Sequence, residues 1–122
     1  MFLIDSSGWI EFFTDGPLAD KYAKYVKTPS RIVTPTIVLY EVYKKVRREK
    51  TEEEALIAVS LMNRTSIIPL RESIALFAAD LSIKYSLPMA DAIVYATAIE
   101  ENCRVVTSDA HFRELENVLF IT

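Results

Sequence analysis

Four acidic side chains stand near the predicted ends of apolar segments, and together they could do metal chemistry. Asp5 directly follows the apolar run "FLI", and Asp109 directly follows "RVVTS". Glu41 lies within the apolar segment "IVLYEVY", and Asp91 opens a helical segment just after Pro88. Crowded carboxylates repel one another, and a bound cation relieves the repulsion. Carboxylates without histidine or thiolate partners select hard ions, Mg²⁺ or Mn²⁺, which can activate water for phosphodiester hydrolysis.

Each acid also has a structural interpretation that needs no metal. Asp5 can cap the helix that follows it, and Asp91 can complement a helix dipole. Asp109 can hold a turn. Glu41 is harder to explain in this way, because an unpaired carboxylate among apolar residues is costly. The metal hypothesis therefore requires all four side chains to meet in space.

The elements that must position these acids alternate between short apolar strands and helices. The pattern predicts strands over residues 2–5, 31–36, 66–70, 103–108 and 117–122. It predicts helices over 6–16, 17–27, 37–50, 52–63, 71–86 and 89–101, and a brief helical turn over 109–115. Ser6 or Ser7 would lie near the first helix cap, and Gly16 would stop that helix. Thr51 followed by Glu54 predicts a capping box.

Continuous apolar strands separated by helices indicate a mostly parallel sheet with helices on both faces. In such a sheet, functional groups gather beyond the carboxyl ends of the strands. We therefore expect the four acids to converge on one edge of the sheet.

Length and composition suit one compact domain over residues 1–122. Hydrophobic residues make up 51% of the chain and glycines number only 2, which favours regular elements over a turn-rich sandwich. A net charge of −3 excludes a generic basic nucleic-acid coat protein, so RNA contacts would need a local basic patch. The single Cys103 excludes an internal disulfide and favours a reducing cytoplasm. No signal peptide or membrane-spanning run is expected.

Four segments in this order resemble the PIN domain family and its VapC-type toxin branch: "FLIDSSGWIEFF", "TIVLYEVYKKV", "LPMADAIVYATAIE" and "RVVTSDAHF". The resemblance implies a Mg²⁺- or Mn²⁺-dependent endoribonuclease with a three-layer α/β/α fold and about five strands. The implied catalytic and metal-binding quartet is Asp5, Glu41, Asp91 and Asp109. Ser7 and Thr107 would support it. Many family members carry another acid two residues after the fourth one, where this chain has His111.

The resemblance also implies a type II toxin with a cognate antitoxin, a homodimer, and tRNA, rRNA or mRNA as substrate. The aromatic residues of "WIEFF", with Tyr22, Tyr25, Tyr40 and Tyr43, could form an interface or could pack internally. Basic residues of helix 37–50 could contact phosphates, meet an acidic antitoxin segment, or form a solvated helix face. They are Lys44, Lys45, Arg47 and Arg48.

Two other functions fit parts of the pattern. A catalytically silent PIN-like module would bind RNA or a protein without cutting, but it has no need of four intact acids. A phosphoryl-transfer receiver would also place an aspartate at a strand end. That class needs an acidic pair at the first strand and a lysine after the last-but-one strand, whereas Asp5 has no adjacent acid and "TSD" has no lysine. The sequence favours the nuclease and leaves the RNA target and the number of metal ions open.

Overall fold

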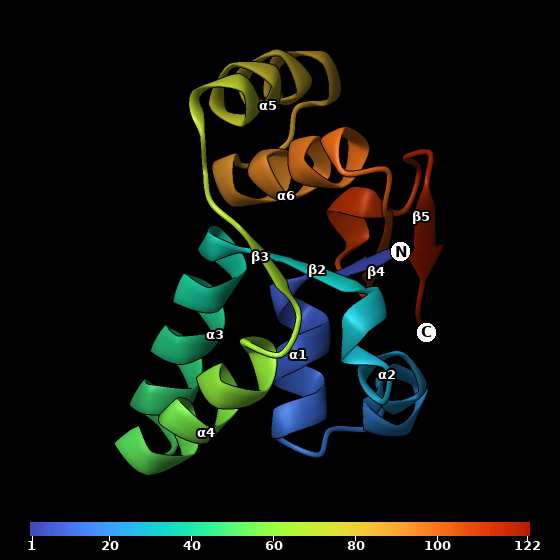
Figure 1. Cartoon of the computed structure of the whole chain (residues 1–122). Coiled ribbons are helices and arrows are strands. Elements are labelled where there is room, and N and C mark those ends of the chain that lie inside the picture. The colour runs from blue at the N-terminus through green and yellow to red at the C-terminus, as the bar shows by residue number, and fades with distance from the viewer.

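A computed structural model describes residues 1–122 and contains a five-stranded sheet between two layers of helices (Figure 1). The strands are β1 (Phe2–Ile4), β2 (Ile32–Pro35), β3 (Ser66–Ile68), β4 (Arg104–Thr107) and β5 (Val118–Phe120). They pair in the order β3-β2-β1-β4-β5, and every pair is parallel. The central strand places Leu3 beside Val33 on one side and beside Val105 on the other. The expected three-layer α/β/α fold is confirmed, and the sheet is parallel throughout.

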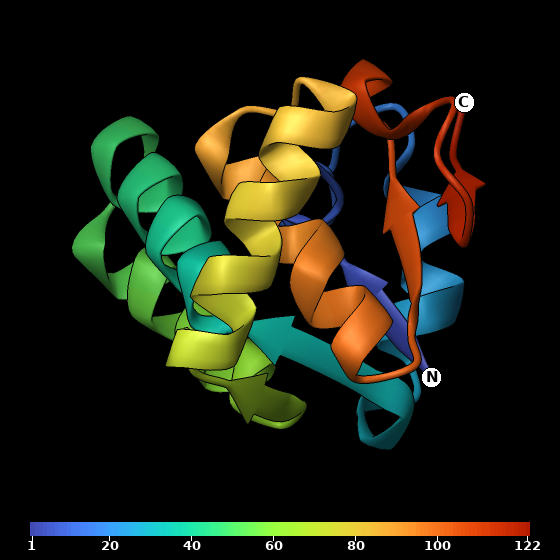
Figure 2. The same cartoon turned by 90° about the horizontal axis from the view of Figure 1, so that it is seen from above.

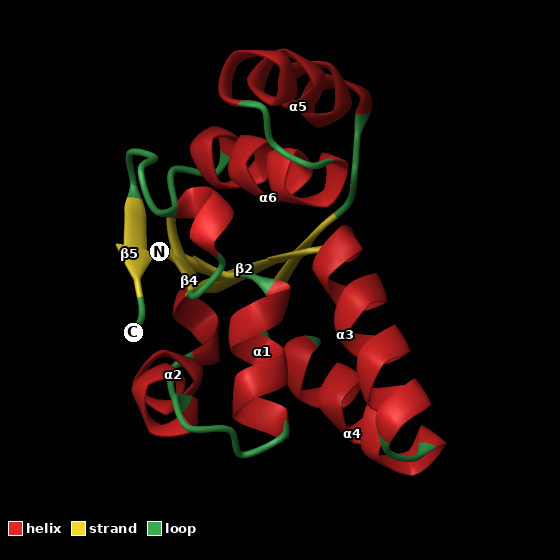
Figure 3. Ribbon diagram, turned by 180° about the vertical axis from the view of Figure 1, so that it is seen from behind, coloured by secondary structure: helices red, strands yellow, loops and turns green.

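The helices divide between the two faces of the sheet, as Figures 1 and 3 show. One layer holds α1 (Ser6–Phe13), α2 (Ala19–Val26), α3 (Thr36–Glu49) and α4 (Glu52–Met62). The other holds α5 (Glu72–Tyr85) and α6 (Met89–Glu100). Two short 3₁₀ helices, η1 (Pro29–Arg31) and η2 (Ala110–Phe112), precede β2 and follow β4. None of the helices has the length and apolar character that crossing a bilayer requires.

The handedness of the crossovers explains this division. The chain moves outward from β1 to β2 and β3 with the first four helices on one face, and it then returns past β1 to reach β4. A right-handed crossover in the reverse direction places the next helices on the opposite face. Figure 2, seen from above, shows α5 and α6 in front of the sheet.

The core lies on both sides of the sheet, because both faces of its strands are covered. Leu3, Ile4, Ile32, Val105 and Val106 are all fully buried. Strands buried on both faces are continuous apolar runs, which is the pattern that identified them in the sequence. Helix α6 lies between α5 and the sheet, and its residues 92–98 are buried without interruption.

The ends of the helices follow local rules. In α4, the Thr51 hydroxyl accepts the Glu54 amide at 3.1 Å, as the predicted capping box requires. Helix α1 ends at Phe13, so the prediction of a stop at Gly16 is wrong. The residue with left-handed backbone there is Asp15, at φ 53°. A Cβ at Gly16 would meet the carboxylate of Glu11, which lies at the end of a flexible side chain and can move aside.

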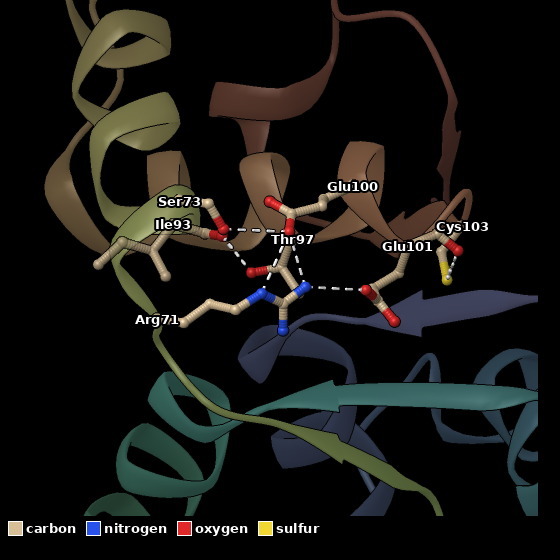
Figure 4. A network of polar contacts seen from close by, with 7 residues as sticks. All are labelled: Arg71, Ser73, Ile93, Thr97, Glu100, Glu101 and Cys103. Carbon is tan, nitrogen blue, oxygen red and sulfur yellow. Dashed lines mark hydrogen bonds and ion pairs between the residues drawn. The ribbon is translucent and has the colours of Figure 1, made fainter.

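An ion-pair cluster joins the start of α5 to the end of α6 (Figure 4). Arg71 Nη2 lies 2.7 Å from Glu100 Oε1 and 3.1 Å from Glu101 Oε2. The Ser73 hydroxyl also donates to Glu100, at 3.2 Å. These groups are partly exposed, and exposed ion pairs add little stability. Buried packing between the two helices, and not this cluster, holds them together.

Candidate active site

The carboxyl ends of β1 and β4 form the base of the candidate site. The connection that leaves β1 leads to β2, whereas β4 pairs on the opposite side of β1. Ligands of open α/β sheets bind at such a point, where the strand order reverses. Asp5 follows β1 directly, and Thr107 is the last residue of β4. The Asp5 amide donates to the Val106 carbonyl at 3.2 Å, which fixes the two strand ends side by side.

Asp5 is buried and accepts three hydrogen bonds. Oδ1 accepts the Ser7 hydroxyl at 2.7 Å and the Gly8 amide at 3.2 Å, so Asp5, rather than Ser6 or Ser7, caps α1. Oδ2 accepts the Thr107 hydroxyl at 2.7 Å. Burial raises the pKa of Asp5 to about 6, the charge of Asp109 adds to the rise, and these hydrogen bonds oppose it. The capping interpretation holds, and Oδ2 still keeps a lone pair that could bind a cation.

Thr107 links the first and fourth acids. Besides donating to Asp5, its buried hydroxyl accepts the Asp109 amide at 2.9 Å. Asp109 in turn caps η2, because its Oδ1 accepts the His111 amide at 2.9 Å. Phe112 is fully buried and anchors η2 in the core. The capping role foreseen for Asp109 therefore holds, and the cap also fixes the carboxylate near Asp5.

Asp91 reaches the same edge from the first turn of α6. Its Oδ2 lies 3.2 Å from His111 Nδ1, and that nitrogen lies 2.8 Å from Asp109 Oδ1. One ligand atom from each of these three residues falls within 4.8 Å of the others. Burial and then the charge of Asp109 raise the pKa of Asp91 to about 7, although His111 opposes the rise. Two carboxylates held this close gain from a bound cation.

Glu41 approaches from α3 and is half-buried. Burial raises the pKa of Glu41, the charge of Asp109 adds to the rise, and the Ser6 hydroxyl opposes it. Glu41 thus lies within electrostatic range of Asp109 but outside the tight cluster of ligand atoms. The structure brings Asp5, Asp91 and Asp109 together through Thr107 and His111, and it places Glu41 at the side.

The donor set fits a divalent cation. The carboxylates supply hard oxygen ligands, and Asp91 and Asp109 both lie within hydrogen-bond distance of the single residue His111. Burial raises the pKa of Asp5, Asp91 and Glu41, and the charge of Asp109 adds to each rise, so a nearby cation would favour the charged forms of these carboxyls. Asp5, Asp91 and Asp109 are the acids that would hold such an ion, and Glu41 lies beside them.

A groove of about 260 Å³ opens beside Glu41. The residues that line it are Ser6, Ile10, Tyr40, Glu41, Lys44, Lys45 and Arg48. The side chain of Tyr40 is 58% exposed, and Lys44 Nζ lies 3.4 Å from its hydroxyl. The groove therefore joins an exposed aromatic ring and basic side chains to one of the predicted site acids.

The four basic residues predicted to bind RNA or a partner separate into two groups. Lys44, Lys45 and Arg48 line the groove, whereas Arg47 does not. Arg47 pairs with Glu52 at the start of α4, at 3.1 Å. In the groove, Lys45 and Arg48 lie 2.8 and 3.7 Å from the Glu49 carboxylate. Adjacent helix positions point in different directions, and the packing of α4 against α3 decides which of them faces the site.

The aromatic residues suggested for an interface pack mainly inside the protein. Trp9 and Tyr22 are buried, and Trp9 stacks on Phe13 with ring centroids 5.6 Å apart. Among the aromatic residues suggested for an interface, only Tyr40 is exposed. The larger exposed apolar surface is mostly aliphatic and lies on α4, on α5 and at the start of α6; it includes Leu56, Ile57, Leu76, Ile83 and Met89.

Tyr22 is a contributor to the site that the sequence did not reveal. Its hydroxyl forms a hydrogen bond of 2.5 Å with the Ser108 hydroxyl, which braces the end of β4 against α2. Burial raises the pKa of Tyr22 to about 12, so the hydroxyl stays neutral. The sequence marked Tyr22 only as an aromatic residue that could form an interface or pack internally, and no motif signals the polar contact.

Comparisons with known proteins agree with this fold. The PIN domain family model matches residues 2–118. The fold is similar to a chain in a toxin–antitoxin complex from Klebsiella pneumoniae, with TM-score 0.83 and 22% identity over 98% of this chain and 96% of that chain. It is similar to VapC20 of Mycobacterium tuberculosis, a toxin that cleaves the sarcin–ricin loop, with TM-score 0.80 and 13% identity over 95% of each chain. It is also similar to a chain of VapBC2 from Rickettsia felis bound to promoter DNA, with TM-score 0.77 and 19% identity over 98% and 96%. No curated protein matches the chain.

Proposed function

This chain belongs to the PIN domain family, and we propose that it is a metal-dependent endoribonuclease acting as the toxin of a toxin–antitoxin pair. One observation carries the proposal: Asp5, Asp91 and Asp109 converge where the strand order of the sheet reverses. Helix and turn capping would explain Asp5 and Asp109 one at a time. Capping gives no reason for Asp91 to lie against Asp109 at a raised pKa.

The acids have different proposed tasks. Asp5, Asp91 and Asp109 would hold Mg²⁺ or Mn²⁺, which when bound supplies an activated water and neutralises charge on the phosphate. Thr107 ties the Asp5 carboxylate to the backbone of Asp109. Glu41 lies on the groove within range of the Asp109 charge, where a carboxylate can orient the attacking water or accept its proton.

The groove beside Glu41 is the proposed path of the RNA. Lys44, Lys45 and Arg48 would contact phosphates, and the exposed ring of Tyr40 offers a surface on which a base can stack. This local basic patch answers the objection raised by the net charge of −3. Arg47 is instead proposed to stabilise the junction of α3 and α4.

The proposed protein partners are a cognate antitoxin and a second copy of the chain. A toxin–antitoxin complex among the similar structures supports the first. Two apolar grooves offer the surface: one of about 630 Å³ along α4, with Leu56 and Ile57, and one of about 350 Å³ between α5 and α6. The thiol of Cys103 is buried and free, and burial raises its pKa, which suits the reducing cytoplasm that we propose as its location.

Cleavage of total cellular RNA tests the proposal. We expect discrete fragments with Mg²⁺ or Mn²⁺, none with EDTA, and none from the Asp91→Asn variant. Asp80→Asn, which removes an exposed acid of α5, is the matched control and should cleave like the wild type. If protein confirmed free of antitoxin cleaves no RNA with either metal, the chain is a silent RNA- or protein-binding module instead.

A further inference from the structure

The one histidine of the chain lies between two of the proposed metal-binding acids. His111 Nδ1 is 2.8 Å from Asp109 Oδ1 and 3.2 Å from Asp91 Oδ2. The His111 amide donates to the same Asp109 oxygen, and the buried ring of Phe112 anchors the helical turn that carries both residues. The imidazole is therefore held against the acids by its own backbone segment.

We propose that His111 is a nitrogen ligand of the metal centre and makes it select Mn²⁺, and softer ions such as Co²⁺, over Mg²⁺. The inference rests on the proposed function, because it concerns the ion that the acids would hold. It assigns to His111 the choice of metal, which the four acids by themselves leave open.

The spacing of the three ligand atoms is compatible with one shared ion. Two ligand atoms that each lie about 2.1 Å from an ion are at most about 4.2 Å apart. The atoms of Asp91, Asp109 and His111 lie within 4.8 Å of one another, so small side-chain adjustments bring all three into one coordination sphere. More than half of the His111 side chain is exposed, which leaves the ring free to make that adjustment.

The chemistry of imidazole gives the expected selectivity. Mg²⁺ requires hard oxygen ligands and keeps several of its waters, so it gains little from a nitrogen. Affinity for nitrogen rises from Mn²⁺ towards Co²⁺ and the later ions. A neutral imidazole in place of a carboxylate also removes one negative charge, which weakens the binding of Mg²⁺ most because that ion has no nitrogen affinity to offset the loss.

Pulsed electron paramagnetic resonance of the Mn²⁺-loaded protein, prepared without a histidine tag, is the direct test. We expect the ¹⁴N coupling of a coordinated imidazole. His111 is the only histidine, so no other side chain can supply that signal. The coupling should vanish in His111→Gln, with circular dichroism confirming that the variant is folded. Wild-type protein that binds Mn²⁺ without imidazole coupling would overturn the proposal.

The ratio of the dissociation constants for Mg²⁺ and Mn²⁺, measured by competition titration, provides a second readout. In His111→Asp this ratio should fall by about tenfold or more, the scale on which altered ligand surroundings change metal affinity. If His111 only holds the two carboxylates by hydrogen bonds, His111→Gln will change both constants alike and leave the ratio unchanged, which refutes a ligand role.

These measurements also separate the inference from the nuclease proposal. Imidazole coupling in a protein that cleaves no RNA would support the ligand and refute the nuclease. Cleavage by protein whose Mn²⁺ has only oxygen ligands would refute the ligand and leave the nuclease standing. Failure to bind Mn²⁺ would overturn the ligand proposal, and failure to bind either Mg²⁺ or Mn²⁺ would overturn both.

Discussion

Replacing Asp91 by Asn should stabilise the metal-free protein while abolishing RNA cleavage. The carboxylate lies beside Asp109 at a half-buried position, and burial and that charge raise the pKa of Asp91 to about 7. The folded state therefore binds the Asp91 proton more tightly than the unfolded state does. At pH 8 the Asp91 side chain is deprotonated, so folding places its negative charge beside that of Asp109. The Asn side chain of the variant has no charge and avoids this repulsion.

The size of the effect follows from the pKa. A rise from 3.8 to about 7 corresponds to about 4 kcal/mol between the protonated and charged forms. Asp91 also favours the first turn of α6 through the helix dipole, an interaction of about 0.3–1 kcal/mol that Asn lacks. Solvent screening reduces the repulsion further, so we expect a net gain of about 1–3 kcal/mol at pH 8.

The stability gained by Asp91→Asn over the wild type should increase as the pH rises. For a carboxyl with a raised pKa in the folded state, the stabilising contribution is complete below pH 3.8 and is lost as the pH rises through about 7. Wild-type protein should therefore lose stability between about pH 4 and pH 7 relative to Asp91→Asn. Near pH 4 the two proteins should differ little, because Asp91 is then largely protonated in the folded state.

Urea unfolding in EDTA, followed by fluorescence, measures this difference. Trp9 is the only tryptophan and is 1% exposed, so its emission reports the loss of the core. The midpoint should rise in Asp91→Asn at an unchanged slope, and Asp80→Asn should stay within about 0.5 kcal/mol of the wild type. Adding Mg²⁺ or Mn²⁺ should stabilise the wild type and not the variant. A less stable Asp91→Asn at pH 8, or a difference that does not vary with pH, would refute the reasoning.

Three further changes test other parts of the structure. Thr107→Val removes the buried hydroxyl that joins Asp5 to the Asp109 amide, so urea unfolding should show a loss of about 1–3 kcal/mol, whereas Thr107→Ser keeps most of the stability. Gly8→Ala forces a methyl group against a buried tyrosine ring and should lower stability by about 1–3 kcal/mol in the same assay. Arg48→Gln should weaken RNA binding and lower its salt dependence by about one counterion, while Arg47→Gln, outside the groove, should not. Equal salt slopes for the two arginine variants would remove the groove from the RNA path.

Sequence patterns predicted the order of the elements because the physical signals were local. Apolar runs between helices marked every strand, and Thr51 with Glu54 marked the start of α4. The end of α1 was misjudged because glycine usually stops a helix through its backbone freedom, whereas here Asp15, and not Gly16, has the left-handed backbone. Aspartate adopts that conformation less often than glycine, so the sequence pointed to the wrong residue.

The candidate site was predictable only as far as its backbone positions. The strand ends and helix starts placed Asp5, Asp91 and Asp109 at one edge, since a parallel sheet orders all its carboxyl ends alike. Side-chain contacts depend on rotamers and on neighbours far along the chain. The sequence could mark His111 as a departure from the family pattern, but it could not show that the ring bridges two acids. The different roles of neighbouring basic residues on α3 required the position of α4.

The central position of β1 has a consequence for how the enzyme is made. The hydrogen bond from Thr107 to Asp5 joins residues 102 positions apart, and β4 must pair with β1 before it can form. At about 5–20 residues per second, a ribosome needs about 5–20 s to synthesise the residues that separate Asp5 from Thr107. Until then the nascent chain holds its first acid without the partners that complete the site. A site built this way cannot assemble until β4 has been synthesised and has paired with β1.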